Sequence, residues 1–180
     1  MAREAGLEPL LDALLQDPSQ APETVAAGYL HPEAGFGEAA AVLDGARQIF
    51  MERTSEEADL VGALRDRVWE KGLLLSTVVP GKEQEGAKFS DYFQFSEPLK
   101  QVPSHRALAL FRGRAEGMLR LAIQLPGQDD LESPSAFGAC DAMIAKRFAI
   151  IDQQRPADRW LADCIRWAWR VKIKSQLDTE

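Results

Sequence analysis

Apolar side chains recur at helical spacing from the start of the chain. The first set follows the i, i+3, i+4, i+7, i+8 pattern and consists of Leu7, Leu10, Leu11, Leu14 and Leu15. Pro9 falls in the first turn, where a missing backbone N–H is tolerated. The pattern predicts a short amphipathic helix that ends before Asp17 and Pro18, and a second short helix over residues 23–30.

A longer helical pattern follows over residues 37–53, and another helix is expected directly after it. Thr54, with Glu57 three residues later, has the spacing of a capping box. We therefore expect the next helix to begin at Thr54 and to run to about Lys71. Gly72 then suits the left-handed conformation that ends many helices.

Two segments rich in aliphatic and β-branched residues, 73–79 and 118–125, predict strands. The two strands can pair as a small sheet if helices pack against them. Residues 126–136 are rich in Pro, Gly, Ser and Asp and predict a surface loop. Helical spacing over 137–149 and 156–176 predicts the last two helices.

The segment between the two strands is expected to be mostly helical. Residues 87–95 predict a short helical segment rich in aromatic residues, and residues 104–114 predict a longer helix. Ser104 is expected to cap this longer helix, and Ala107, Leu108, Leu110 and Phe111 are expected to lie on its apolar side.

These elements predict a mainly α, multihelical fold with a minor two-stranded β hairpin. We expect a single helical region over 1–180, with an acidic helical part (1–72), a strand-helix-strand part (73–125) and C-terminal helices (137–176). Apolar residues make up 46% and charged residues 27%, as in a soluble globular protein. No apolar run approaches the ~18 residues of a membrane span, and the start lacks a signal-peptide pattern, so we expect a cytoplasmic protein without a membrane partner.

The net charge of −7 is distributed unevenly along the chain. Residues 1–64 carry three basic and twelve acidic side chains, whereas residues 65–180 carry eighteen basic and sixteen acidic ones. The acidic total argues against a dedicated nucleic-acid-binding domain. A local basic patch can nevertheless bind phosphate while the rest of the surface repels it.

Basic side chains concentrate on and just before the helix expected over 104–114. The candidate nucleic-acid contacts are Lys100, His105, Arg106, Arg112 and Arg114. These cations can form ion pairs with the acidic first part of the chain, or they can contact the backbone of a nucleic acid. Both interpretations stay open at the level of the sequence.

The sequence shows no catalytic arrangement, and we expect no enzymatic activity. A phosphate-binding loop needs a lysine and a hydroxyl after its second glycine, but Ala87 follows Gly86 and Phe89 takes the place of the hydroxyl. Cys140 and Cys164 lie in apolar helical stretches, where thiols are buried packing groups. Two cysteines and two histidines fit no zinc spacing, so we expect neither a metal nor a cofactor.

The last predicted helix has an apolar side that is expected to face the core and that includes Trp160, Trp167, Val171, Leu161 and Ile165. It also carries two large apolar residues away from this side. At about 100° per residue, Trp169 and Ile173 fall about 180° and 220° from Trp160, beside a basic stripe that begins at Arg166. One interpretation is a wide apolar face that another segment of this chain covers. The other makes Trp169 and Ile173 a docking surface for a downstream domain, exposed in this chain by itself.

Three stretches together resemble one protein family: EGAKFSDYFQFSEPL (85–99), VPSHRALALFRGRAEG (102–117) and RPADRWLADCIRWAWRVKI (155–173). They are similar to the N-terminal helical region of the Tex-type bacterial transcription accessory proteins. The order of the stretches and the opening over residues 3–10 agree as well, so the resemblance covers nearly the whole chain. Gln94 departs from the acidic residue expected at its position, which alters one loop charge.

The resemblance implies a cytoplasmic nucleic-acid-binding protein linked to transcription, with a eukaryotic elongation factor and histone chaperone among its relatives. Family members carry a ribonuclease-H-like domain, a helix-hairpin-helix module and an OB-type RNA-binding domain beyond this region. None of the three is recognisable here, so we expect a fragment whose nucleic-acid contacts run through the full-length protein. The alternative is a scaffold that positions downstream domains or contacts RNA polymerase without touching nucleic acid, which the acidic first part favours.

Overall fold

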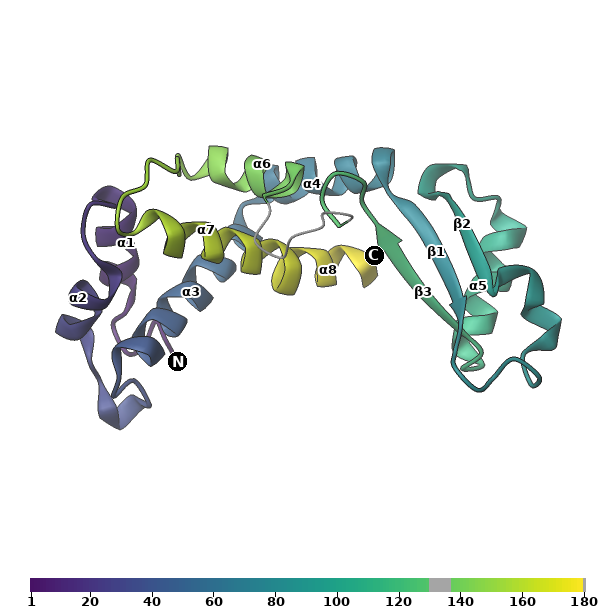
Figure 1. Ribbon diagram of the computed structural model, residues 1–180, viewed down its shortest axis with the longest axis horizontal. Helices are drawn as coiled ribbons and strands as arrows, with labels where there is room; N and C mark the ends of the chain where they lie inside the picture. The colour runs from purple at the N-terminus through teal and green to yellow at the C-terminus, as the bar shows by residue number, and fades with distance from the viewer. Residues whose placement is uncertain (130–136, 180) are drawn as a thin grey trace. The chain divides into compact units, whose positions relative to one another are not determined.

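The structure is a computed structural model that describes residues 1–129 and 137–179. It is mainly helical with one small antiparallel sheet, as the sequence predicts (Figure 1). Of the loop predicted over 126–136, residues 126–129 form a turn and the rest lie outside the described residues.

The chain forms two compact units, one of residues 1–62 with 139–180 and one of residues 63–138. Helix α4 (Ala58–Lys71) begins in the first unit and ends in the second. The expected strand-helix-strand part lies in the second unit, whereas the C-terminal helices belong with the N-terminal helices. By sequence, the first unit has eleven basic and eighteen acidic side chains and carries the whole charge of −7, while the second has ten of each.

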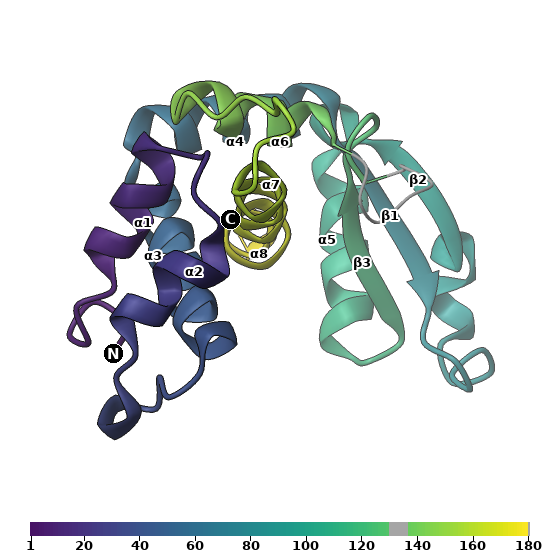
Figure 2. The same ribbon diagram turned by 60° about the vertical axis from the view of Figure 1, so that its left-hand side comes forward.

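Helices build the first unit, and α3 contacts most of the others. Its helices are α1 (Glu8–Gln16), α2 (Pro22–Ala26), α3 (Ala39–Glu56), α6 (Ala139–Arg147), α7 (Asp158–Trp167) and α8 (Lys174–Thr179). Helix α3 packs against α1, α2 and α7, and Figure 2 shows α1 and α3 side by side. The core between α1 and α3 contains Leu10, Leu14, Ile49 and Phe50, all of which are buried.

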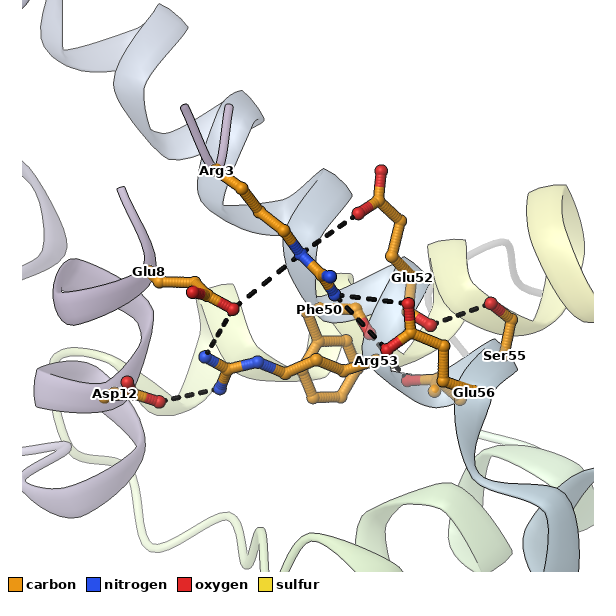
Figure 3. Close-up of polar contacts among 9 residues, drawn as sticks. Arg3, Glu8, Asp12, Phe50, Glu52, Arg53, Ser55 and Glu56 are labelled. Carbon is orange, nitrogen blue, oxygen red and sulfur yellow. Dashed lines mark hydrogen bonds and ion pairs between the residues drawn. The ribbon is translucent and has the colours of Figure 1, made fainter. Parts of the chain in front are cut away.

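Ion pairs join the N-terminal segment and α1 to α3 (Figure 3). The Arg53 guanidinium lies 2.6 Å from Asp12 and 3.4 Å from Glu8, and the hydrogen bond to Asp12 raises the pKa of Arg53. Arg3 lies 3.3 Å from Glu52. Arg47, the third basic side chain of residues 1–64, lies 2.6 Å from Asp44, so all three are engaged with acids of that same segment.

Two predicted helix ends differ in the structure. Helix α3 continues through Thr54 to Glu56, and the buried Thr54 hydroxyl donates to the Phe50 oxygen at 2.8 Å. The predicted capping box is wrong because this hydroxyl bonds the preceding turn of its own helix. Gly72 is not left-handed; a Cβ there would lie 2.4 Å from the Val68 oxygen, so a close backbone approach explains the glycine.

The second unit is a three-stranded antiparallel sheet with helical segments packed against it. Strand β1 (Leu73–Val78) lies between β2 (Gln94–Pro98) and β3 (Leu119–Gln124), so the two predicted strands do pair. Helix α5 (Ser104–Ala115) and the 3-10 helix η3 (Ala87–Tyr92) contact the sheet. The shared core consists of Leu74, Phe89, Leu110 and Leu119.

Strand β2 replaces the end of the helical segment expected over 87–95 and gives the sheet a third strand. In β2, Phe95 and Glu97 are half-buried while their neighbours are exposed, which is the two-residue period of a strand. Phe95 lies opposite Ser76 of β1. Pro98 is tolerated because β2 is an edge strand. This alternation covers only the five residues of β2 and follows directly after aromatic residues, so the sequence pattern did not indicate a strand.

Candidate nucleic-acid interface

Helix α5, which carries most of the basic candidates, is held tightly against β3. It begins at Ser104, which is the first helical residue rather than its cap, because Pro103 occupies the capping position. Gly113 lies inside the helix, where a Cβ would be 2.4 Å from Leu119 Cδ1. Gly117, with φ of 76°, makes the left-handed turn after the helix. This close approach to β3 determines which side of α5 faces outward.

The outward side of α5 carries two large apolar side chains. Leu108 is 69% exposed and Phe111 is 47% exposed. The predicted apolar side is right for Leu110, which is buried, and wrong for these two residues, because α5 is buried through Leu110 and Gly113. These two positions lie about 160° around the helix from Leu108 and Phe111 respectively.

Two of the five basic candidates are engaged in ion pairs within the second unit. Lys100 Nζ lies 2.5 Å from Glu70 Oε2, and this contact lowers the pKa of Glu70. Arg106 Nη1 lies 2.7 Å from Glu97 Oε2, and this hydrogen bond raises the pKa of Arg106. Ion pairing therefore accounts for both cations, with partners outside residues 1–64.

The other three candidates, His105, Arg112 and Arg114, are exposed and have no ion-pair partner among residues 1–129 and 137–179. His105 and Arg112 lie two helical turns apart on one side of Leu108. Arg114 lies on the other side of the apolar pair, with its guanidinium carbon 5.2 Å from the centre of the Phe111 ring. Five exposed residues of α5 are grouped in this way, and we call them the α5 face: His105, Leu108, Phe111, Arg112 and Arg114.

The α5 face combines two kinds of group that bind single-stranded nucleic acid. Guanidinium groups donate paired hydrogen bonds to phosphate oxygens. An exposed aromatic ring such as Phe111 offers a surface on which a base can stack. Leu108 adds an apolar contact of the kind that protein partners also bury.

The docking candidates Trp169 and Ile173 lie in the core of the first unit. Trp169 is 1% exposed and Ile173 is 0% exposed. Both belong to the π-helix η5 (Ala168–Ile173), which packs against α3. Trp169 and Ile173 continue the buried i, i+4 row of Leu161 and Ile165, and the π-helix, which turns less per residue than an α-helix, keeps Ile173 on that side. The docking interpretation needs these side chains exposed, and they are not; the structure agrees with the other interpretation, in which another segment of this chain covers both.

The apolar residues that the last helix does expose are ones that the sequence analysis assigned to the core. Trp167 is 44% exposed and Val171 is 49% exposed. A signal for this was present in the unbroken i, i+4 row of apolar residues on the opposite side. That row is buried throughout and consists of Leu161, Ile165, Trp169, Ile173 and Leu177.

The chain matches known proteins along its length. A family model described as Tex central region-like matches residues 17–180. The protein YhgF of Escherichia coli is 48% identical over 180 residues, which are 100% of this chain and 23% of that protein. The protein Tex of Bordetella pertussis is 47% identical over 184 residues, with the same two shares. The chain belongs to the Tex family.

A third Tex-family relative, the transcriptional accessory protein Tex of Neisseria gonorrhoeae, is 44% identical over 181 residues, again 100% of this chain and 23% of that protein. The chain thus spans less than a quarter of the length of these relatives. The resemblance found in the sequence is confirmed.

No helix within residues 1–129 and 137–179 has the length and apolar character needed to cross a membrane. Over the same residues, His, Cys, Asp and Glu form no group of three or more that could hold a metal ion. Cys140 and Cys164 are buried, and burial raises the pKa of Cys164 well above its usual value.

Proposed function

We propose that this Tex-family domain binds nucleic acid through the α5 face, as a non-catalytic part of a transcription accessory protein. The observation that carries the proposal is the separation between engaged and available cations. Lys100 and Arg106 are held by carboxylates, whereas Arg112 and Arg114 are exposed, and Arg114 lies over the exposed Phe111 ring. The name of the relative from Neisseria gonorrhoeae supports the link to transcription.

The expected binding is weak and depends on salt. Arg112 and Arg114 release counterions from the nucleic acid when they contact its phosphates. The affinity gained in this way does not depend on the base sequence. The first unit opposes it, because its charge of −7 repels a polyanion. We therefore expect a Kd no tighter than the micromolar values of non-specific binding, about 10⁻⁴ to 10⁻⁶ M.

The burial of both thiols supports a non-catalytic role. Cys140 and Cys164 are each 0% exposed. A nucleophilic cysteine needs an accessible thiolate, and the raised pKa of Cys164 keeps that thiol protonated at neutral pH.

Fluorescence anisotropy with a labelled single-stranded RNA of about 20 nucleotides tests the site. Replacing Arg112→Ala together with Arg114→Ala is expected to weaken binding by about tenfold or more. The matched control is Arg159→Ala with Lys172→Ala, which removes two exposed cations from the first unit. An equal loss of RNA affinity in both double variants would show that only the net charge matters, and it would contradict the α5 face as the binding site.

A protein-interaction scaffold is the second candidate, and the exposure of Leu108 and Phe111 favours it, because a protein partner gains from burying them. In this role the domain positions the rest of the protein or contacts RNA polymerase, and nucleic acid does not touch α5. No RNA binding at ~20 mM salt, where phosphate contacts are strongest, would select the scaffold.

A further inference from the structure

Trp167 is an exposed tryptophan whose position is already constrained by its neighbours. The guanidinium carbon of Arg47, from α3, lies 4.3 Å from the centre of the Trp167 ring. Arg47 is in turn held 2.6 Å from Asp44. A ring ordered in this way loses little conformational entropy when a partner covers it. Rigid aromatic anchors next to arginine are typical of residues that dominate protein interfaces.

Trp167 and Val171 form one small apolar surface on the last helix of the first unit. Their exposed fractions are 44% and 49%, and they are four residues apart. The opposite side of this helix, through Trp169 and Ile173, is fully committed to the core. The exposed pair therefore contributes little to the stability of this unit and is available to a partner.

We infer that Trp167 and Val171 dock the part of a Tex protein that follows this region in the longer family members. The relatives are more than four times as long, since this chain covers 23% of each, and it matches their N-terminal part. Helices α7 and α8, with η5 between them, are the last described elements, so the surface lies on the helix that leads toward the remainder.

The size of the surface favours a partner in the same chain. A stable interface between separate molecules buries about 800 Å² on each side, far more than one Trp and one Val provide. A tethered partner needs much less area, because covalent linkage gives it a high effective concentration. A nucleic acid is disfavoured by the charge of −7 on this unit.

The surface also specifies the chemistry of its partner. Trp167 requires an apolar pocket, and Arg47 at the edge of its ring is already paired with Asp44, so the pocket need not supply a carboxylate. The inference does not rest on the proposed nucleic-acid binding, because the α5 face belongs to the other unit.

Thiol labelling at position 171 tests the docking. Val171→Cys is made in the 180-residue chain and in a chimera in which this chain replaces the matching region of E. coli YhgF. Cys140 and Cys164 are buried, so maleimide reacts with the new thiol, and peptide mass spectrometry identifies the site. We expect labelling at 171 to be at least about tenfold slower in the chimera.

Two matched variants make the result specific. Glu23→Cys, at an exposed position of α2, is expected to label equally fast in both proteins. Adding Trp167→Ala to the chimera is expected to restore fast labelling at 171, because the anchor of the docked part is removed.

Four other labelling results at position 171 are possible, and each would overturn the inference. Equal labelling rates in the two proteins would show that nothing docks. Protection in the 180-residue chain that grows with its concentration would show a second copy, and protection independent of concentration would show a segment of this chain. Protection that appears only after RNA is added would show a nucleic acid.

Discussion

Trp169 has the largest fully buried side chain of the described residues, and its indole Nε1 has no hydrogen-bond partner there. Trp169→Ala is expected to lower the free energy of unfolding by about 3–5 kcal/mol, because it leaves a cavity beside α3. Trp169→Phe is expected to lose less, since it retains most of the ring and removes the unbonded N–H. Urea denaturation followed by circular dichroism measures both.

The control for Trp169 is its neighbour Trp167. Trp167→Ala is expected to cost about 1 kcal/mol or less, because this ring is 44% exposed and loses mainly its contact with Arg47. A larger loss at Trp167 than at Trp169 would contradict the burial of Trp169 and the exposure of Trp167.

Asp158 is a buried carboxylate that holds the loop before α7. It accepts backbone N–H bonds from Gln153 at 2.8 Å and Arg155 at 3.0 Å, and a side-chain bond from Arg155 Nε at 3.1 Å. Within this loop Gln154 has a positive φ of 59°. Burial alone raises the pKa of Asp158, but the hydrogen bonds from Arg155 and Gln153 outweigh it and lower the pKa below the usual 3.8.

The depressed pKa of Asp158 makes its contribution to stability depend on pH. The contribution is complete above the usual pKa of 3.8 and is lost as the pH falls through the lower folded-state value. Asp158→Asn is therefore expected to cost about 1–3 kcal/mol at pH 7 and to show less further loss of stability in acid. Urea denaturation at pH 7 and pH 3 checks this, with the exposed Asp59→Asn as the control. Parallel loss in acid for wild type and Asp158→Asn would contradict it.

At the scale of elements, two helical glycines provide a matched test of how α5 packs. A Cβ at Gly113 would lie 2.4 Å from Leu119 Cδ1, and Leu119 is 2% exposed, so it has little room to move. A Cβ at Gly62 in α4 would meet nothing within 4 Å. We expect Gly113→Ala to destabilise by about 1–3 kcal/mol and Gly62→Ala to stabilise by about 0.5–1 kcal/mol.

Thermal unfolding of the two alanine variants measures this difference. Stabilisation by both substitutions would show that α5 does not approach β3 as closely as the structure has it.

The elements that the sequence predicted well are those whose apolar period repeats several times. The leucines of α1 and the aliphatic run of β1 are examples, and both form where expected. Strand β2 was missed because it has one short alternation at the edge of the sheet. Trp167 was misplaced because the predicted core-facing side extended to it, whereas the buried row from Leu161 to Leu177 lies on the other side of the helix.

At the scale of the whole molecule, the sequence showed the cluster of basic residues between Lys100 and Arg114. It could not show which of these cations form ion pairs and which remain available. Lys100 is paired with Glu70 and Arg106 with Glu97, 30 and 9 residues away in sequence. Both pairings depend on the position of β2 beside β1 in the sheet, and the sequence analysis did not predict β2. Only the fold separates Arg112 and Arg114 from the engaged cations.

The difference in net charge between the two units predicts which unit a nucleic acid contacts. The first unit carries −7 and the second is balanced, so the α5 face is the region of the second unit where unpaired positive charge meets an exposed aromatic ring. A nucleic acid is expected to contact this face and to stay away from the first unit.

The salt dependence of RNA binding tests this claim most directly. Log Kd for single-stranded RNA is measured against log salt from about 50 to about 200 mM, where each phosphate contact contributes a slope of about 0.7. Arg112→Ala with Arg114→Ala is predicted to reduce the slope by about 1.4, while Arg159→Ala with Lys172→Ala leaves it unchanged. An unchanged slope in the α5 variant, or an equal reduction in both, would contradict nucleic-acid binding at the α5 face.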